Sequence, residues 1–100
     1  MKVIEYYGDN VYKDNAKNVF EYDGGSWRGF YNELEKTVMY LSDLDFKFED
    51  LDRSMIVVMD DGYIMRLNNG EYRSVCFRCN SCRIWKVTNI DIINAINERI

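Results

Sequence analysis

Between residues 26 and 42, apolar side chains recur every three or four positions, which is the spacing of one face of an α-helix. The residues on this face are Trp27, Phe30, Tyr31, Leu34, Val38 and Leu41. Ser26 can cap the N-terminus, and Gly29 costs about 1 kcal/mol of helix propensity, which burial of such a face outweighs. We therefore expect a helix over residues 26–42 that packs on a sheet. Its charged neighbours should face solvent: Glu33, Glu35, Lys36 and Asp43.

The segments on either side of this helix predict strands. Residues 2–7 and 18–22 are rich in β-branched and aromatic residues, and a polar stretch, 12–17, separates them, so they predict an opening pair of strands. An alternative for residues 14–17 is the start of a short helix. Apolar and charged residues alternate over 44–48, which predicts one more strand.

The second half of the chain predicts a β-meander. Tight-turn dipeptides separate runs of β-branched and aromatic residues there. The expected strands are 55–59, 63–67, 71–79 and 82–87, and the expected two-residue turns are Asp61–Gly62, Asn69–Gly70 and Asn80–Ser81. The two Gly-containing turns, type I′ candidates only eight residues apart, are the most specific signals in the sequence.

A short helix is expected at the C-terminus, over residues 89–100. Thr88, with Asp91 three positions later, resembles a capping box. Four isoleucines then share one helical face: Ile92, Ile93, Ile96 and Ile100. The predicted fold is a single compact α+β domain over residues 1–100. Its antiparallel sheet is covered on one face by the helix at 26–42, and the C-terminal helix closes an end or the same face.

Composition narrows the function. The chain has 100 residues, 47% of them hydrophobic, so it can form one core but not two domains. It contains no His, no P-loop and no dinucleotide-binding glycine motif, which excludes imidazole-based catalysis and phosphate-cradling loops. Only a carboxylate-based mechanism would remain, and a domain this small leaves little room for a substrate cleft. We therefore expect a non-enzymatic protein without a cofactor.

Charge is divided unevenly along the chain. Residues 1–61 contain 14 acids and seven bases, whereas residues 62–100 contain three acids and six bases. Seven acids fall within 43–61: Asp43, Asp45, Glu49, Asp50, Asp52, Asp60 and Asp61. These acids predict a surface that occupies the basic groove of a protein that handles nucleic acid. The plainer interpretation is a solvated face that keeps a small domain soluble.

The last predicted hairpin combines rings and guanidinium groups. A two-residue turn at Asn80–Ser81 would place Cys76 opposite Trp85 and would put Val75 and Ile84 on the core face. The opposite face carries four residues suited to base stacking or to an anionic ligand: Tyr72, Arg78, Arg83 and Trp85. The alternative is that Tyr72 and Trp85 pack beneath a helix while the arginines reach solvent.

Three cysteines form the pattern C-x-x-C-x-x-C at Cys76, Cys79 and Cys82. A closed zinc site needs four ligands, and the sequence offers neither a fourth Cys nor a His, so the metal signal is weak. The cysteines are better explained as small hydrophobic residues in a reducing compartment. A disulfide between Cys79 and Cys82 is a third alternative.

The leading hypothesis is therefore a stoichiometric protein-binding module, of the accessory or inhibitor kind that phages and mobile elements encode, with a nucleic-acid-handling host protein as its partner. Direct nucleotide or single-strand binding through the hairpin and a metal-bearing structural domain are the alternatives. The candidate aromatic anchors are Trp27, Tyr40, Tyr63 and Trp85. No apolar run reaches the roughly 18 residues of a membrane span, so we expect a cytoplasmic protein. A homodimer through an edge strand at 2–7 or 44–48 is also considered.

Overall fold

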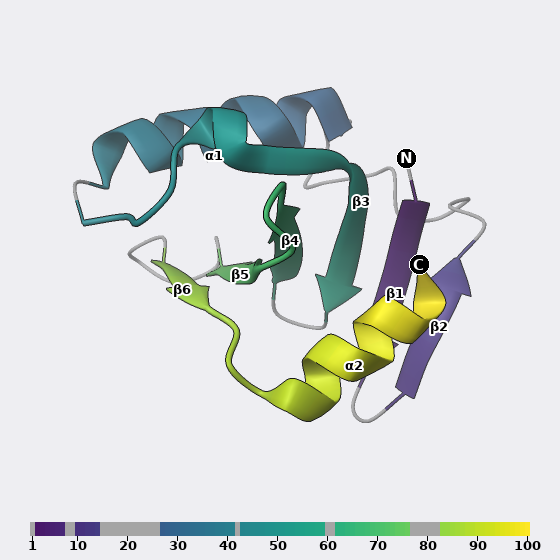
Figure 1. Ribbon diagram of the computed structural model, residues 1–100. Helices are drawn as coiled ribbons and strands as arrows, with labels where there is room; N and C mark the ends of the chain where they lie inside the picture. The colour runs from purple at the N-terminus through teal and green to yellow at the C-terminus, as the bar shows by residue number, and fades with distance from the viewer. Residues whose placement is uncertain (1, 8–9, 15–26, 42, 60–61, 77–82) are drawn as a thin grey trace.

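The computed structural model describes residues 2–7, 10–14, 27–41, 43–59, 62–76 and 83–100. These residues form six strands, β1 (Lys2–Tyr7), β2 (Asn10–Asp14), β3 (Leu51–Met59), β4 (Tyr63–Leu67), β5 (Tyr72–Cys76) and β6 (Arg83–Lys86). They also form the helices α1 (Trp27–Tyr40) and α2 (Ile90–Arg99) and a single 3-10 turn, η1 (Phe48–Asp50). The predicted α+β class is confirmed (Figure 1).

The six strands form one sheet in the order β2-β1-β3-β4-β5-β6. The expected meander is present as β3-β4-β5-β6, with antiparallel neighbours throughout. The sheet departs from the prediction at β1, which runs parallel to β3. Strand β2 pairs with the outer side of β1 and forms the edge of the sheet. After α1, the chain returns to the sheet as β3, which pairs with the inner side of β1.

The two helices lie on opposite faces of the sheet (Figure 1). The expectation that α2 closes an end or shares the face of α1 is therefore wrong. The buried cluster under α1 comprises Trp27, Phe30, Leu34, Phe46, Phe48, Leu51, Ile56, Met65, Leu67 and Val75. The cluster on the α2 face comprises Ile4, Met55, Val57, Ile64, Tyr72, Val87 and Ile96. Alternation along each central strand supplies both clusters, so the sheet is the middle layer of three.

Three N-terminal predictions are corrected or lie outside the described residues. The second strand is β2, at Asn10–Asp14, and it overlaps the start of the polar connection predicted at 12–17. Ser26, the predicted helix cap, and the predicted strand at 18–22 lie outside the described residues. Because β1 lies between β2 and β3, it offers no free edge for the homodimer that was considered.

Segment 44–48 is not a strand, although its alternation correctly predicts burial. Phe46 and Phe48 are buried under α1 and Leu44 is half-buried. Asp50 turns the chain here, because its carboxylate accepts from the Lys47 N–H and its own N–H donates to the Lys47 carbonyl, each over 2.9 Å. The segment therefore packs as a loop and a 3-10 turn, and it cannot form the second dimer edge that was considered.

Both reversals around β4 are present. The N–H of Met59 donates to the carbonyl of Gly62 over 2.9 Å, so the first reversal lies between Met59 and Gly62 and not at the predicted pair Asp61–Gly62. The second is a three-residue loop, not the predicted two-residue turn, because Leu67 N–H bonds the carbonyl of Glu71. Gly70 adopts φ +90° there, the left-handed conformation that such a loop requires at its last residue.

The last hairpin and the last helix differ from the prediction in register. Cys76 pairs with Arg83 rather than with Trp85, and Trp85 pairs with Ser74. The pairing is shifted by two residues, which keeps each side chain on its predicted face of the sheet. Val75 and Ile84 therefore lie on the α1 side. The N-cap of α2 is Asn89, not Thr88, because the Asn89 side chain accepts from the N–H groups of residues 91 and 92.

Candidate protein-binding surface

Strand β6 forms one edge of the sheet and carries an exposed tryptophan. Trp85 is 50% exposed, and the neighbouring end of α1 exposes Tyr40 by 87% and Met39 by 80%. Most large apolar side chains of the described residues are buried, so three exposed ones near one edge are informative. They mark this edge as an unusually apolar part of the described surface.

A groove lies between β6 and the C-terminal end of α1, with a volume of about 710 Å³. We call it the α1-side groove. It is lined by Tyr40, Leu41, Asp43, Leu44, Arg83, Ile84 and Trp85. The apolar lining comes from α1, from the loop that follows it and from β6, so segments far apart in sequence build one recess.

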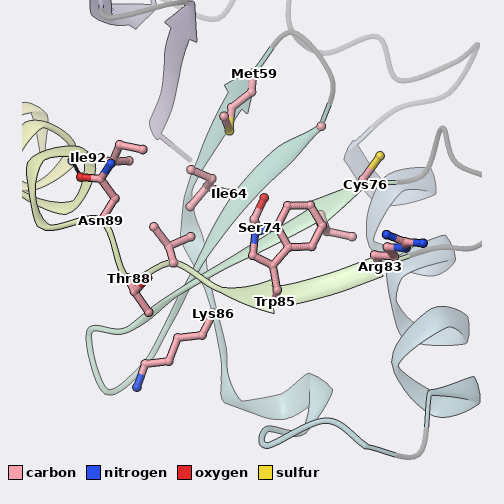
Figure 2. A pocket seen from close by; sticks show the side chains of 13 residues that line it. Met59, Ile64, Ser74, Cys76, Arg83, Trp85, Lys86, Thr88, Asn89 and Ile92 are labelled. Carbon is pink, nitrogen blue, oxygen red and sulfur yellow. Dashed lines mark hydrogen bonds between the residues drawn. The ribbon is translucent and has the colours of Figure 1, made fainter.

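A pocket of about 570 Å³ lies on the opposite face of the sheet, between β6 and the start of α2. We call it the α2-side pocket. Its lining is mainly apolar: Met59, Ile64, Val75, Cys76, Trp85, Val87 and Ile92, with Gly62, Ser74, Arg83, Lys86, Thr88 and Asn89. Figure 2 shows the Trp85 indole in the middle of this set, beside Ser74, its paired residue on β5. Trp85 and Arg83 therefore contribute to both recesses.

Two of the polar side chains that line the α2-side pocket lack partners in the described part of the chain. Ser74 is 8% exposed, and its hydroxyl has no hydrogen bond to any residue within the described part of the chain. The guanidinium of Arg83 likewise has no ion pair among the described residues. Among the residues that the structure describes, no Asp or Glu lines the pocket. It can thus accept an apolar group together with an acidic or polar one.

Lys86 also lines the α2-side pocket, but Figure 2 shows its amino group pointing away from the other lining residues. Its Nζ lies 2.8 Å from Oε2 of Glu71. The Glu71 carboxylate also accepts from the side chains of Asn69 and Arg73. Hydrogen bonds, first from Lys86 and then from Asn69, lower the pKa of Glu71 from 4.5 to about 2. The charge of Lys86 is thus partly neutralised, whereas Arg83 has no ion-pair partner within the described ranges.

Two of the predicted surface acids are committed to the fold. Asp45 binds the buried Arg73 through two contacts, Nη2 to Oδ2 at 2.6 Å and Nε to Oδ1 at 3.2 Å. This hydrogen bonding lowers the pKa of Asp45. Asp52 accepts from Ser54 and from Arg66, and these bonds lower its pKa in the same way. Both acids hold neighbouring strands and loops together.

The remaining predicted acids form a smaller surface than expected. Asp43, Glu49 and Asp50 are exposed, and Asp50 also caps η1. Asp60 and Asp61 lie outside the described residues. Of the five predicted acids that the structure describes, Asp43 alone borders one of the recesses beside β6. The acidic segment and the exposed aromatic side chains are thus largely separate features.

Of the predicted ligand face, Tyr72 does not lie at the surface with Arg83 and Trp85. Tyr72 is 1% exposed, and its hydroxyl donates to Asn97 of α2, so it packs beneath that helix as the alternative proposed. Arg83 and Trp85 remain exposed together, and Arg78 lies outside the described residues. Sequence reasoning missed Ser74, the groove lining at Leu41 and Leu44, and Asn89. Their positions depend on register and on helix placement.

The other sequence candidates are distributed as follows. Of the four predicted anchors, Trp27 is buried and Tyr63 packs against Trp27 and Phe30, with ring centroids 6.0 and 4.6 Å apart. Cys76 is buried, whereas Cys79 and Cys82 lie outside the described residues. Within the described ranges, no cluster of three or more Cys, Asp or Glu side chains could hold a metal ion. Tyr40 and Trp85 are thus the exposed anchors.

Comparison with known proteins finds no family model, no curated protein and no solved structure that matches this chain. None of the helices in the described ranges has the length and apolar character needed to cross a membrane. Function must therefore be argued from the surface itself. We call the exposed set Tyr40, Arg83 and Trp85 the β6 surface.

Proposed function

We propose that the chain is a non-enzymatic protein-binding module that contacts its partner through the β6 surface. One observation carries the proposal: Tyr40, Arg83 and Trp85 are exposed around one groove. Trp, Tyr and Arg are the residue types most enriched among those that dominate binding energy at protein interfaces. Two adjoining apolar recesses would bury the side chains that a partner presents.

The β6 surface replaces the acidic segment as the proposed contact region, because Asp45 and Asp52 are held in ion pairs within the fold. Asp43, Glu49 and Asp50 stay available to steer a basic partner during approach. An inhibitory role, and a partner that handles nucleic acid, stay predictions from the sequence.

Affinity capture with matched variants tests this proposal. The purified chain, Trp85→Ala, Tyr40→Ala and Ile90→Ala would each be used as bait in an extract of the source cells, with quantitative mass spectrometry. Ile90 is 61% exposed but lines neither recess, so Ile90→Ala controls for loss of an exposed apolar side chain. We expect a protein retained by the wild type and Ile90→Ala and reduced about tenfold by the other two variants. Equal retention by all four, with circular dichroism showing native folds, would contradict the proposal.

Arg83 and Trp85 also favour a second candidate, binding of a nucleotide or single-stranded nucleic acid. They share the α2-side pocket, and a guanidinium beside an indole suits an anionic, flat ligand. Quenching of tryptophan fluorescence by a nucleotide mixture and by oligothymidine separates the candidates. Quenching that Arg83→Glu abolishes would favour this alternative over a protein partner.

A further inference from the structure

The outer edge of β6 has no backbone hydrogen-bond partner in the part of the chain that the structure describes. In an antiparallel ladder, successive residues point their N–H and C=O groups alternately toward and away from the neighbouring strand. The N–H of Val87 donates to the carbonyl of Tyr72 on β5 over 3.1 Å, so Trp85 and Arg83 also point their backbone groups inward. The N–H and C=O groups of Ile84 and Lys86 therefore face outward. No other strand of the described residues pairs with that edge.

The two recesses lie on the two sides of this edge. The α1-side groove borders the face that carries Ile84, and the α2-side pocket borders the face that carries Trp85. Side chains of a strand point alternately to the two faces of a sheet. A strand added beside β6 would thus direct alternate side chains into the groove and into the pocket. A bound helix would leave the edge N–H groups without partners.

The positive charges of β6 indicate which kind of strand would pair with it. Arg83 and Lys86 are two of the four residues of β6, and only Lys86 has an ion-pair partner among the described residues. Because no described Asp or Glu lines the α2-side pocket, an acidic side chain of the partner would meet Arg83 there. A second copy of the chain would instead bring another Arg83 and Lys86 to the same edge, and like charges across a strand pair are destabilising.

From these observations we infer that the partner binds by strand addition. An extended segment pairs with β6 through Ile84 and Lys86, places apolar side chains alternately in the α1-side groove and the α2-side pocket, and sets an acidic side chain beside Arg83. This inference rests on the proposed function and specifies its binding mode. Main-chain hydrogen bonds supply affinity, and the two recesses and Arg83 supply selectivity.

Selection from a phage-displayed library of random twelve-residue peptides on the immobilised full chain tests the inference. The expected enriched sequences alternate apolar residues and carry Asp or Glu. In hydrogen exchange with an enriched synthetic peptide, the amides of Ile84 and Lys86 should gain protection, since no described strand bonds them in the free chain. Arg83→Glu should lower the affinity of the chain for that peptide about tenfold or more.

A backbone variant separates strand pairing from side-chain contact. Lys86→Pro removes an outward N–H without breaking a bond to β5, and proline is tolerated on edge strands in that orientation. Lys86→Ala removes the same side chain and keeps the N–H, so the additional loss in the proline variant measures the edge hydrogen bond. If Lys86→Pro does not fold, hydrogen exchange on the wild-type chain still shows whether the peptide pairs with the edge of β6.

Four outcomes overturn strand addition: no enriched peptide, enrichment of helical or basic sequences, unprotected amides at Ile84 and Lys86, or self-association through β6 in sedimentation. None of these outcomes bears on whether Trp85→Ala and Tyr40→Ala lose the partner in the capture experiment. The proposed function therefore fails only in the capture experiment, and the two failures can be distinguished.

Discussion

The hydroxyl of Tyr72 donates a hydrogen bond of 2.5 Å to Oδ1 of Asn97, which joins β5 to α2. Tyr72 is buried and Asn97 is exposed, so the two partners differ in what their removal leaves behind. Without Tyr72, the amide of Asn97 turns to water. Without Asn97, a buried hydroxyl loses its acceptor.

This asymmetry predicts that Asn97→Ala destabilises the fold more than Tyr72→Phe does. Tyr72→Phe should lower the free energy of unfolding by about 1 kcal/mol, and Asn97→Ala by about 1–3 kcal/mol. Urea denaturation followed by circular dichroism measures both. Asn94→Ala, at another exposed position of α2, is the control and should change little. The reverse order would show that the hydrogen bond does not hold α2.

Asp45 and Asp43 are neighbours in the predicted acidic surface but should differ in their effect on stability. Asp45→Asn weakens the pair that neutralises Arg73, whose side chain is 2% exposed, and leaves Glu71 as the other acid within reach of that guanidinium. The variant should therefore lower the denaturation midpoint. Asp43→Asn, at an exposed position, should leave it unchanged. Equal midpoints would mean that Asp45 contributes nothing to the fold.

Glu71 predicts how stability responds to acid. Its pKa is lowered from 4.5 to about 2 by hydrogen bonds from Lys86 and Asn69, so the folded chain binds its proton less readily than the unfolded chain does. The stabilisation is complete above pH 4.5 and is lost as the pH falls toward 2. Melting temperatures across that range should decline less steeply for Glu71→Gln. Identical slopes would contradict this origin of acid sensitivity.

Gly62 and Gly29 should respond in opposite ways to alanine. A Cβ at Gly62 would collide with the carbonyl oxygen of Val75, part of the β4–β5 ladder, so Gly62→Ala forces β4 and β5 apart. At Gly29, in the first turn of α1, a Cβ meets no atom within 4 Å, and alanine should stabilise the helix by about 0.5–1 kcal/mol. Thermal melting of both variants measures these effects, and each variant is the control for the other because both replace Gly by Ala. A stabilised Gly62→Ala would contradict the described approach of the strands.

Local signals in the sequence predicted much of the fold. The periodicity of α1, the Gly-containing reversals on either side of β4 and the isoleucine face of α2 all act over a few residues, and each reports its own element. Strand β2 was missed because its sequence, NVYKD, is polar and it pairs at an outer edge. The parallel pairing of β1 with β3 carries no local signal at all.

The candidate site was only partly predictable for the same reason. Composition indicated Tyr40, Arg83 and Trp85 as binding residues, because exposed aromatic and arginine side chains serve that purpose on any fold. Their convergence depends on where the end of α1 lies above β6. The ion pairs that occupy Asp45 and Asp52 likewise join residues 14 to 28 positions apart, which a count of charges cannot show.

The insertion of β1 between β2 and β3 has a consequence for the order of folding. Lys2 pairs with Met55, 53 positions along the chain, whereas β3 to β5 are joined by short reversals. Closing a long loop costs more entropy than closing a short one and slows the step that depends on it. We expect β3, β4 and β5 to assemble first, with the N-terminal hairpin added later, so that early intermediates present the bare side of β3 as their most vulnerable edge.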